Sequence, residues 1–260
     1  MISQDALDCS GFLGGRLRIW QPLNGYRGGI DPVLLAAAVP AKANDSVLEL
    51  GLGAGTASLC LATRQQGLRL AGVEVQADYA ALARRNAEEN GITLEVFEAD
   101  IAELPFDLRA RSFDHVIANP PYFRPEGRSP AADQGRETGR GEQRPLGAWV
   151  EAGCRRLRPG GTLTLIQMMS RLPDLLKALP EGGTTVQPFA AREGREPDRI
   201  ILWHRKGGRG AFRMLAPLTL HAGAAHLQDG DDFAPWAKAV LRDVAALPVM
   251  ARACPPPPLA

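Results

Sequence analysis

The stretch SVLELGLGAGTASLCLATRQQGLRLAGVEV, residues 46–75, contains the pattern that decides the fold. It begins with a short, mostly apolar run at 46–50, which is typical of a buried strand and leads directly into a turn with three glycines. Residues 56–67 then predict a helix, and residues 69–75 predict a second strand. A strand, a helix and a strand in this order indicate a βαβ unit with two parallel strands.

The alternation of helices and strands continues outward from this unit. A helix is expected at 31–41, with Pro32 in its first turn, and another at 77–91, capped by Gly91. Further strands are expected at 93–100, 113–119, 158–167, 184–190 and 199–207, with a helix starting near Trp149 before the third of these. The last two strands read as an antiparallel pair at the edge. The pattern predicts an α/β fold, a mostly parallel sheet with an antiparallel edge strand.

Length and composition limit the organisation of the chain. Its 260 residues are 45% hydrophobic and 23% charged, which is sufficient for a sizeable core. We expect one domain over residues 1–245, with an N-terminal extension and helix over 1–45, and a flexible tail over 246–260. Residues 123–145 lack periodicity, which predicts a long loop.

The four cysteines are scattered and form no CxxC pair, so neither a disulfide framework nor a metal site is indicated. The N-terminus has no secretory signal, and no apolar run reaches the roughly 20 residues that span a bilayer. These observations predict a cytoplasmic protein.

The glycine turn predicts a ligand site at the carboxyl edge of the sheet. Gly51, Gly53 and Gly55 lack side chains between a strand and a helix, so a ligand can lie against the backbone. Glu74 ends the second strand, where a Rossmann-type fold places an acid on ribose hydroxyls, and Asp100 ends the third. The alternative is a turn that binds no ligand, with carboxylates that only face solvent. The position of the two acids at the ends of successive strands favours a nucleotide-like cofactor instead.

Two cofactors compete for this site, a dinucleotide and S-adenosylmethionine. The dinucleotide fingerprint is GxGxxG, whereas this turn is GxGxG. It is preceded by Glu49, an acid that repels a pyrophosphate but suits the cationic amino-acid or sulfonium end of S-adenosylmethionine. The pattern therefore favours S-adenosylmethionine.

The motif NPPY, residues 119–122, leaves the fourth strand at the same edge. An exocyclic amine such as that of adenine is a poor nucleophile because its lone pair is delocalised into the ring. If the Asn119 side-chain oxygen and the Pro120 carbonyl each accept one N–H, the lone pair turns toward a methyl donor, and Pro121 helps to make the placement rigid. Tyr122 offers a ring on which an extruded base can stack. These residues predict N-methylation without a metal ion.

The net charge of +1 gives no global basic field, so a nucleic-acid partner needs a local patch. The segment WHRKGGRGAFR, residues 203–213, is the best candidate, because it contains no acid and its glycines can bring backbone N–H groups close to phosphates. Its predicted RNA-binding residues are Arg205, Lys206, Arg209 and Arg213. A solvated hairpin is the alternative.

The order of ELGLGAG, GVEV, EAD and NPPY resembles the Rossmann-like class I methyltransferases that act on amines conjugated to a planar system. GYRGGIDPVLLAAAVPA before the first strand, and RIILWHRKGGRG followed by APLTLH after the last, resemble the bacterial enzymes that methylate N6 of adenine in valine tRNA, just 3′ of the anticodon. The resemblance implies a seven-stranded sheet, tRNA as partner, and a segment that closes over the methionine end of the cofactor around Tyr26, Arg27 and Asp31. The cofactor residues it implies are Glu49, Gly51, Gly53, Gly55, Glu74, Asp100 and Asn119.

Other substrates remain open. Glutamine N5 of a release factor and guanine N2 of rRNA suit the same motif, but those enzymes carry a larger N-terminal domain or a second copy of the domain. A DNA adenine methyltransferase would need a target-recognition domain, for which we find no segment. A non-catalytic S-adenosylmethionine- or RNA-binding module and an NAD-dependent oxidoreductase are alternatives of other classes, against which an intact NPPY argues.

Overall fold

The computed structural model describes residues 2–122, 144–223 and 232–249. Most of the loop predicted at 123–145 and of the tail predicted at 246–260 lies outside these ranges. The strands are β1 Leu7–Phe12, β2 Leu17–Pro22, β3 Ser46–Leu50, β4 Arg69–Glu74, β5 Leu94–Glu98, β6 Phe113–Ala118, β7 Leu157–Met168, β8 Gly182–Ala190, β9 Pro197–Lys206, β10 Arg213–Met214 and β11 Leu218–Thr219. The helices are α1 Ile30–Ala37, α2 Thr56–Arg64, α3 Ala77–Glu89, α4 Phe106–Arg109, α5 Leu146–Arg156, α6 Leu172–Ala178 and α7 Pro235–Arg242.

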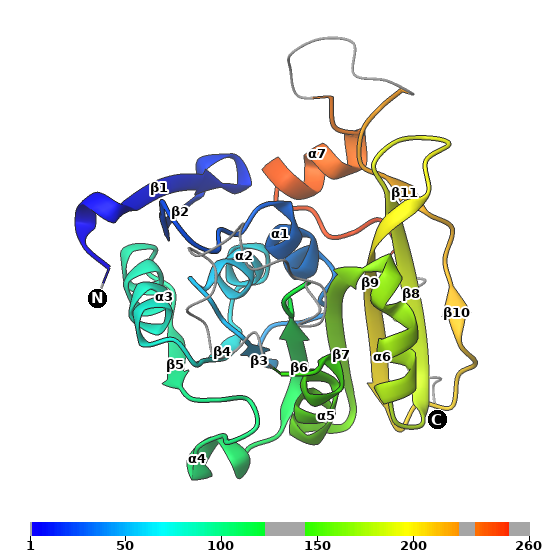
Figure 1. Ribbon diagram of the computed structural model, residues 1–260, viewed down its shortest axis with the longest axis horizontal. Coiled ribbons are helices and arrows are strands. Elements are labelled where there is room, and N and C mark those ends of the chain that lie inside the picture. Colours follow the sequence, from blue (N-terminus) through cyan, green and yellow to red (C-terminus); the bar gives the residue numbers. More distant parts are fainter. Residues whose placement is uncertain (1, 123–143, 224–231, 250–260) are drawn as a thin grey trace, which may run out of the picture.

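One mixed sheet forms the centre of the molecule (Figure 1). Its strand order is β10-β8-β9-β7-β6-β3-β4-β5, and β11 also pairs with β8. Strands β3 to β7 are parallel, whereas β9 runs antiparallel to both β7 and β8. The predicted α/β class with a parallel core is confirmed. The antiparallel strand β9 is third in this order, next to β8, and the two-residue strands β10 and β11 add to the seven longer strands.

Helices cover both faces of this sheet because each face is apolar. Side chains of α1, α2 and α7 pack on one face around Leu34, Leu59 and Trp203. Side chains of α5 and α6 pack on the other around Val150 and Leu163. Among the described residues, no helix is long and apolar enough to cross a membrane, and no group of three or more acidic, histidine or cysteine side chains is arranged to hold a metal ion.

Local sequence signals set the ends of several elements. Gly91 has a φ of +64°, and the N–H groups of Gly91 and Ile92 bond the carbonyls of Glu88 and Ala87. This pair of bonds is a Schellman motif, and it ends α3 at the predicted glycine. On the far side of the sheet, α5 passes directly into β7 at Leu157, one residue before the predicted start of that strand.

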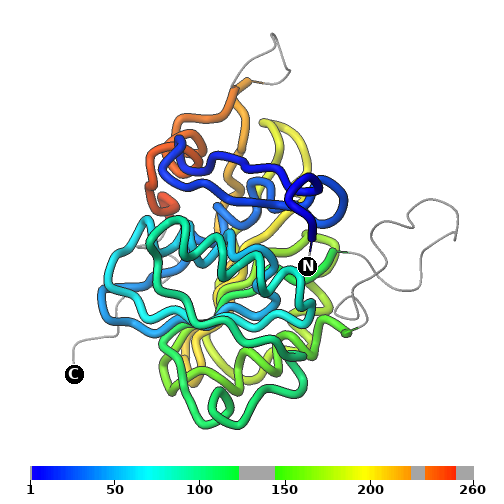
Figure 2. The backbone as a smooth tube through the Cα atoms, turned by 90° about the vertical axis from the view of Figure 1, so that its left-hand side faces the viewer, coloured from blue at the N-terminus to red at the C-terminus, as the bar shows by residue number. Residues whose placement is uncertain are grey.

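An N-terminal hairpin, β1 and β2, lies outside the main sheet. Figure 2 shows it beside the segment that contains α7, and Arg16 Nη1 donates to the Arg242 carbonyl at 2.7 Å. The sequence pattern predicted only an extension here. The missed signal is the alternation of Leu17 and Ile19 with polar neighbours after a Gly-Gly pair.

Candidate active site

The glycine turn between β3 and α2 has a backbone that only glycine adopts without strain. Gly51 and Gly53 have φ values of +68° and +55°. A Cβ atom at Gly51 would lie 2.6 Å from the ring of Trp149, whereas at Gly53 the nearest side-chain atom is Tyr26 Cε1 at 3.9 Å. The turn is therefore packed against Trp149 at Gly51 and has open space on the Tyr26 side at Gly53. We call this open side of the turn the glycine cradle.

Two buried carboxylates hold this turn. Glu74 accepts the Gly53 N–H at 2.8 Å and the Gln76 N–H at 2.9 Å through its two oxygens. Glu49 accepts from both the N–H and the hydroxyl of Ser58 at the start of α2. Burial raises the pKa of both acids, and that of Glu49 rises to about 8 despite the Ser58 bonds. Each carboxylate keeps further lone pairs for a ligand.

A pocket lies between this turn and the N-terminal segment. Its wall contains Gln21, Tyr26, Gly28, Pro32, Glu49, Gly51, Leu52, Ala54, Thr56, Ala57 and Asn119. Gln21 Oε1 accepts the Gly28 N–H at 2.6 Å, which joins β2 to the segment before α1. The open glycine cradle, the Glu49 carboxylate and the Asn119 amide fit S-adenosylmethionine, which carries a ribose and a cationic amino-acid end.

Asn119 contacts Tyr26 across the pocket. Its Nδ2 donates to the Tyr26 hydroxyl at 2.9 Å, and the Tyr26 carbonyl in turn accepts from the Tyr79 hydroxyl at 3.0 Å. Because the nitrogen of the Asn119 amide is engaged, its oxygen is the atom left for a ligand N–H. Tyr26 is 55% exposed at the rim.

The two prolines of the motif face a residue that the sequence did not identify. Gln167 on β7 is fully buried, and its Nε2 donates to the Pro120 carbonyl at 3.2 Å and the Pro121 carbonyl at 3.5 Å. No local pattern reveals this contact, because Gln167 and Pro120 are far apart in the sequence.

Tyr122 is tied to the N-terminal helix. Its hydroxyl donates to Asp31 Oδ2, and the other oxygen of Asp31 lies 3.0 Å from Arg199 Nη1 on β9. Burial and then the Asp31 charge raise the pKa of Tyr122 above its ordinary value. Asp31 therefore contacts the predicted base-stacking residue rather than the wall of the pocket.

Two other predicted cofactor residues pair elsewhere. Arg27 binds Asp8 of β1 and donates to the Ser10 hydroxyl at 3.0 Å. Asp100 accepts from the Ala102 N–H at 2.9 Å and from Arg144 Nη2 at 2.7 Å. Partial burial raises the pKa of Asp100, but these bonds outweigh it and hold the pKa below its ordinary value. Neither side chain lines the pocket described above.

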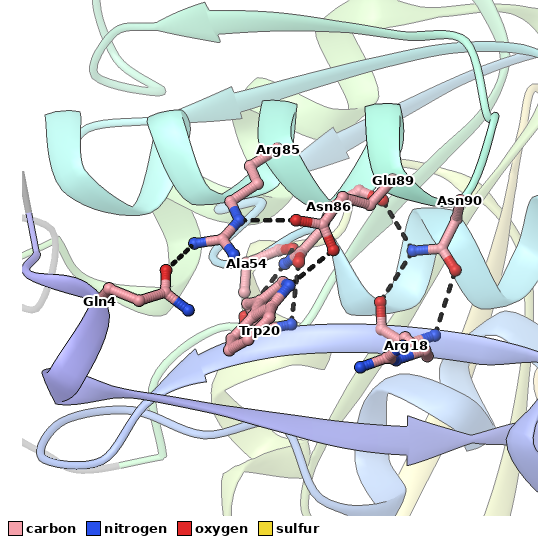
Figure 3. A network of polar contacts seen from close by, with 8 residues as sticks. All are labelled: Gln4, Arg18, Trp20, Ala54, Arg85, Asn86, Glu89 and Asn90. Carbon is pink, nitrogen blue, oxygen red and sulfur yellow. Dashed lines mark hydrogen bonds and ion pairs between the residues drawn. The ribbon is translucent and has the colours of Figure 1, made fainter.

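The amide side chains of α3 bind the hairpin edge (Figure 3). Asn86 accepts the Trp20 N–H at 2.8 Å and donates to the carbonyls of Trp20 at 3.0 Å and Ala54 at 2.9 Å. One helical turn later, Asn90 binds the N–H and carbonyl of Arg18. Ala54 belongs to the glycine turn, so Asn86 joins the hairpin directly to the pocket wall.

The predicted RNA-binding residues lie at the opposite edge of the sheet. Arg205 pairs with Thr162 in the register of β7 and β9, five positions before Gln167, which is about 16 Å along a strand. Lys206 Nζ donates to the carbonyls of Cys154 at 2.8 Å and Leu157 at 2.7 Å, so it caps the end of α5. Arg209 follows β9 and Arg213 pairs with Thr185 of β8, and both residues are exposed.

Comparison with known proteins gives the family. The model of the methyltransferase small domain matches residues 29–179. The tRNA1(Val) (adenine(37)-N6)-methyltransferase of Tolumonas auensis is 30% identical over 67% of this chain and 74% of its own length. The release factor glutamine methyltransferase of Chlorobaculum tepidum is 35% identical over 35% of this chain and 32% of its own length. The crystal structure of a predicted O-methyltransferase from Agrobacterium tumefaciens, 24% identical, has a TM-score of 0.67 over 83% of this chain and 97% of its own, and shows the fold alone.

These matches confirm the resemblance that the ordered motifs indicated. The family match includes the glycine turn, the strand-end acids and NPPY, which meet at one edge of the sheet. The chain belongs to the methyltransferase small domain family and is an S-adenosylmethionine-dependent methyltransferase.

Proposed function

We propose that this protein transfers a methyl group from S-adenosylmethionine to the exocyclic N6 amine of an adenine in tRNA, next to the anticodon. The observation that carries the proposal is the pair of acceptors at the end of β6. The Asn119 amide nitrogen is engaged by Tyr26, which leaves its oxygen for an amine N–H, and the Pro120 carbonyl lies one residue away. Two acceptors at this spacing suit the two N–H groups of a planar amine.

When bound, S-adenosylmethionine supplies an electrophilic methyl group on a positively charged sulfur. The glycine turn and the carboxylates of Glu49 and Glu74 would hold the cofactor, with Tyr26 in the segment over its methionine end. The side chains of Arg27, Asp31 and Asp100 are paired with other residues and would have to exchange those partners to contact it. Asn119 and Pro120 would orient the amine lone pair, and Tyr122 would hold the ring. Positioning of this kind is the main source of rate, because the amine needs no strong base.

The sequence relatives support adenine in tRNA as the substrate over other amines. The tRNA1(Val) adenine methyltransferase of Tolumonas auensis matches two thirds of this chain, whereas the release factor glutamine methyltransferase matches about one third of it. Glutamine N5 of a protein is the second candidate, because the same acceptors suit a side-chain amide.

For RNA contact we propose Arg205, Arg209 and Arg213. Arg205 lies opposite Thr162, near the amino ends of the parallel strands, and Arg213 lies opposite Thr185 on β8, so a bound RNA would have to extend along the sheet for its base to reach Asn119. Lys206 was also predicted to bind RNA, but its bonds to the end of α5 commit its ammonium group to the fold. Within this proposal residues 1–245 act as one domain.

The test is methyl transfer from radiolabelled S-adenosylmethionine to total tRNA, total rRNA and protein from cells that lack the enzyme. We expect label in tRNA alone, recovered as N6-methyladenosine after nucleoside digestion, and no label with Asn119→Ala. Label in protein as methylglutamine, or in rRNA as a methylguanosine, would overturn the substrate proposal.

A further inference from the structure

Gln167 is a buried polar side chain to which the proposed chemistry assigns no role. It lies near the end of β7 with no exposed surface, among strands whose other inward side chains are mostly apolar. Its amide nitrogen donates to the Pro120 carbonyl at 3.2 Å and, more weakly, to that of Pro121 at 3.5 Å. Gln167 therefore contacts the backbone of the motif that would bind the target amine.

The orientation of this amide is fixed by its other end. Gln167 Oε1 accepts the Met168 N–H at 2.9 Å, so the nitrogen must face the proline carbonyls. A carbonyl oxygen has two lone pairs, and Gln167 uses one of those on Pro120. The second lone pair is left for one N–H of a substrate amine.

Proline alone does not fix where its carbonyl points. The ring sets φ near −65°, and the following Pro121 restricts ψ to the extended range, which still spans tens of degrees. Rotation within that range swings the carbonyl oxygen away from any bound amine. A hydrogen bond from a buried, rigid strand residue narrows the range to one direction.

We propose that Gln167 is a positioning residue, which holds the Pro120 carbonyl in the direction where it accepts an N–H of the substrate amine. The inference rests on the proposed function, because it needs an amine at NPPY, but it holds for adenine, guanine or glutamine alike. Since a misplacement of about 1 Å can cost on the order of 10²-fold in rate, loss of this bond should cost at least about tenfold.

The experiment compares Gln167→Met with Gln187→Met. Methionine keeps the length of the side chain and removes the donor. Gln187 is the matched control: it is also fully buried, and its Nε2 donates to the carbonyls of Pro188 and Ala216 at 2.8 Å each, on β8 and away from NPPY. Both variants and the wild type are assayed on whichever of the tRNA, rRNA or protein pools the wild type methylates.

The readouts are the single-turnover rate at saturating substrate and cofactor, the Kd for S-adenosylmethionine by calorimetry, and the Tm. We expect Gln167→Met to lower the single-turnover rate at least tenfold with the Kd within twofold, and Gln187→Met to leave the rate within twofold. A Gln167→Met rate within twofold of wild type overturns the inference, as does an equal loss in both variants that follows the Tm. Wild-type activity on rRNA or protein would refute only the tRNA proposal, whereas no activity on any pool would refute both.

Discussion

Replacing Asn86 by alanine should destabilise the protein more than any other single change in the contact between the hairpin and α3. Its side chain is fully buried and makes three hydrogen bonds, two with Trp20 and one with the Ala54 carbonyl (Figure 3). At about 1 kcal/mol of net stability per bond, the loss is about 3 kcal/mol. The buried Ala54 carbonyl has the least access to water as a replacement partner.

Asn90 provides the matched control for this prediction. Its bonds to the N–H and carbonyl of Arg18, at 3.1 and 2.8 Å, are exposed to solvent, and its Nδ2 also donates to the partly buried Asn86 carbonyl at 2.7 Å. Water can replace the two exposed bonds to Arg18, so Asn90→Ala should cost about 1 kcal/mol, for the partly buried bond to Asn86. Both variants remove an asparagine that binds the same strand from the same helix, so the difference between them reports mainly on the buried bonds of Asn86.

The assay is urea denaturation followed by circular dichroism, with the free energy of unfolding compared at equal m-values. Calorimetry with S-adenosylmethionine gives a second readout, since Ala54 lines the pocket and Gln21 reaches it from β2. We expect weaker cofactor binding for Asn86→Ala and unchanged binding for Asn90→Ala. Equal destabilisation by the two variants would refute the reasoning that the buried bonds hold the hairpin to the glycine turn.

Three further predictions concern the site and its surface. Burial raises the Glu49 pKa to about 8, and a bound cation would lower it, so cofactor binding below pH 8 should release a proton. The affinity should therefore increase up to tenfold for each unit that the pH rises. Calorimetry at pH 6.5 in two buffers of different ionisation heat measures this release, and the absence of a released proton would contradict the prediction. Tyr26→Phe removes the acceptor for Asn119 Nδ2 but keeps the ring at the pocket wall, so kcat should fall about fivefold and the cofactor Kd should change by less; an unchanged kcat would count against that hydrogen bond. Arg205→Ala with Arg209→Ala should reduce the salt slope of tRNA binding by about 1 for each phosphate that the variant no longer neutralises, whereas an unaltered slope would exclude this patch.

The parts of the fold that were predictable are those with local causes. The strand predicted at residues 46–50 matches β3 residue for residue. The mostly apolar run begins after the polar residues 44–45 and ends at Gly51, so both ends of the strand have a local signal. Gly91 ends α3 for the same kind of reason, since the left-handed conformation of the cap favours glycine. The parallel order of β3, β4 and β5 follows from the helices that connect them.

The contacts that hold the site together were not predictable, because each joins residues distant in sequence. Gln167 reaches Pro120 across 47 positions, and Asn86 reaches Trp20 across 66. A lone glutamine in an apolar strand, or a lone asparagine in a helix, carries no periodic signal that names its partner. Asp31 was expected near the cofactor, but its carboxylate contacts Tyr122 of the motif that would bind the target base.

The target-binding motif is held by residues from both sides of it in the sequence, and these contacts extend beyond the residues of the family match. NPPY receives Tyr26 and Asp31 from before the first strand of the parallel core, and Gln167 from its last. Asp31 in turn is paired by Arg199, which lies on β9, beyond the matched residues 29–179. Because the ring of Tyr122 depends on Asp31, and Asp31 depends on Arg199, the antiparallel strand β9 contributes to the placement of NPPY, although it carries no residue of the motif. Loss of the β8–β9 pair should therefore impair the site for the amine more than it impairs the glycine turn. The contacts described for that turn come from Glu49, Glu74 and Asn86, and none of these residues lies on β8 or β9.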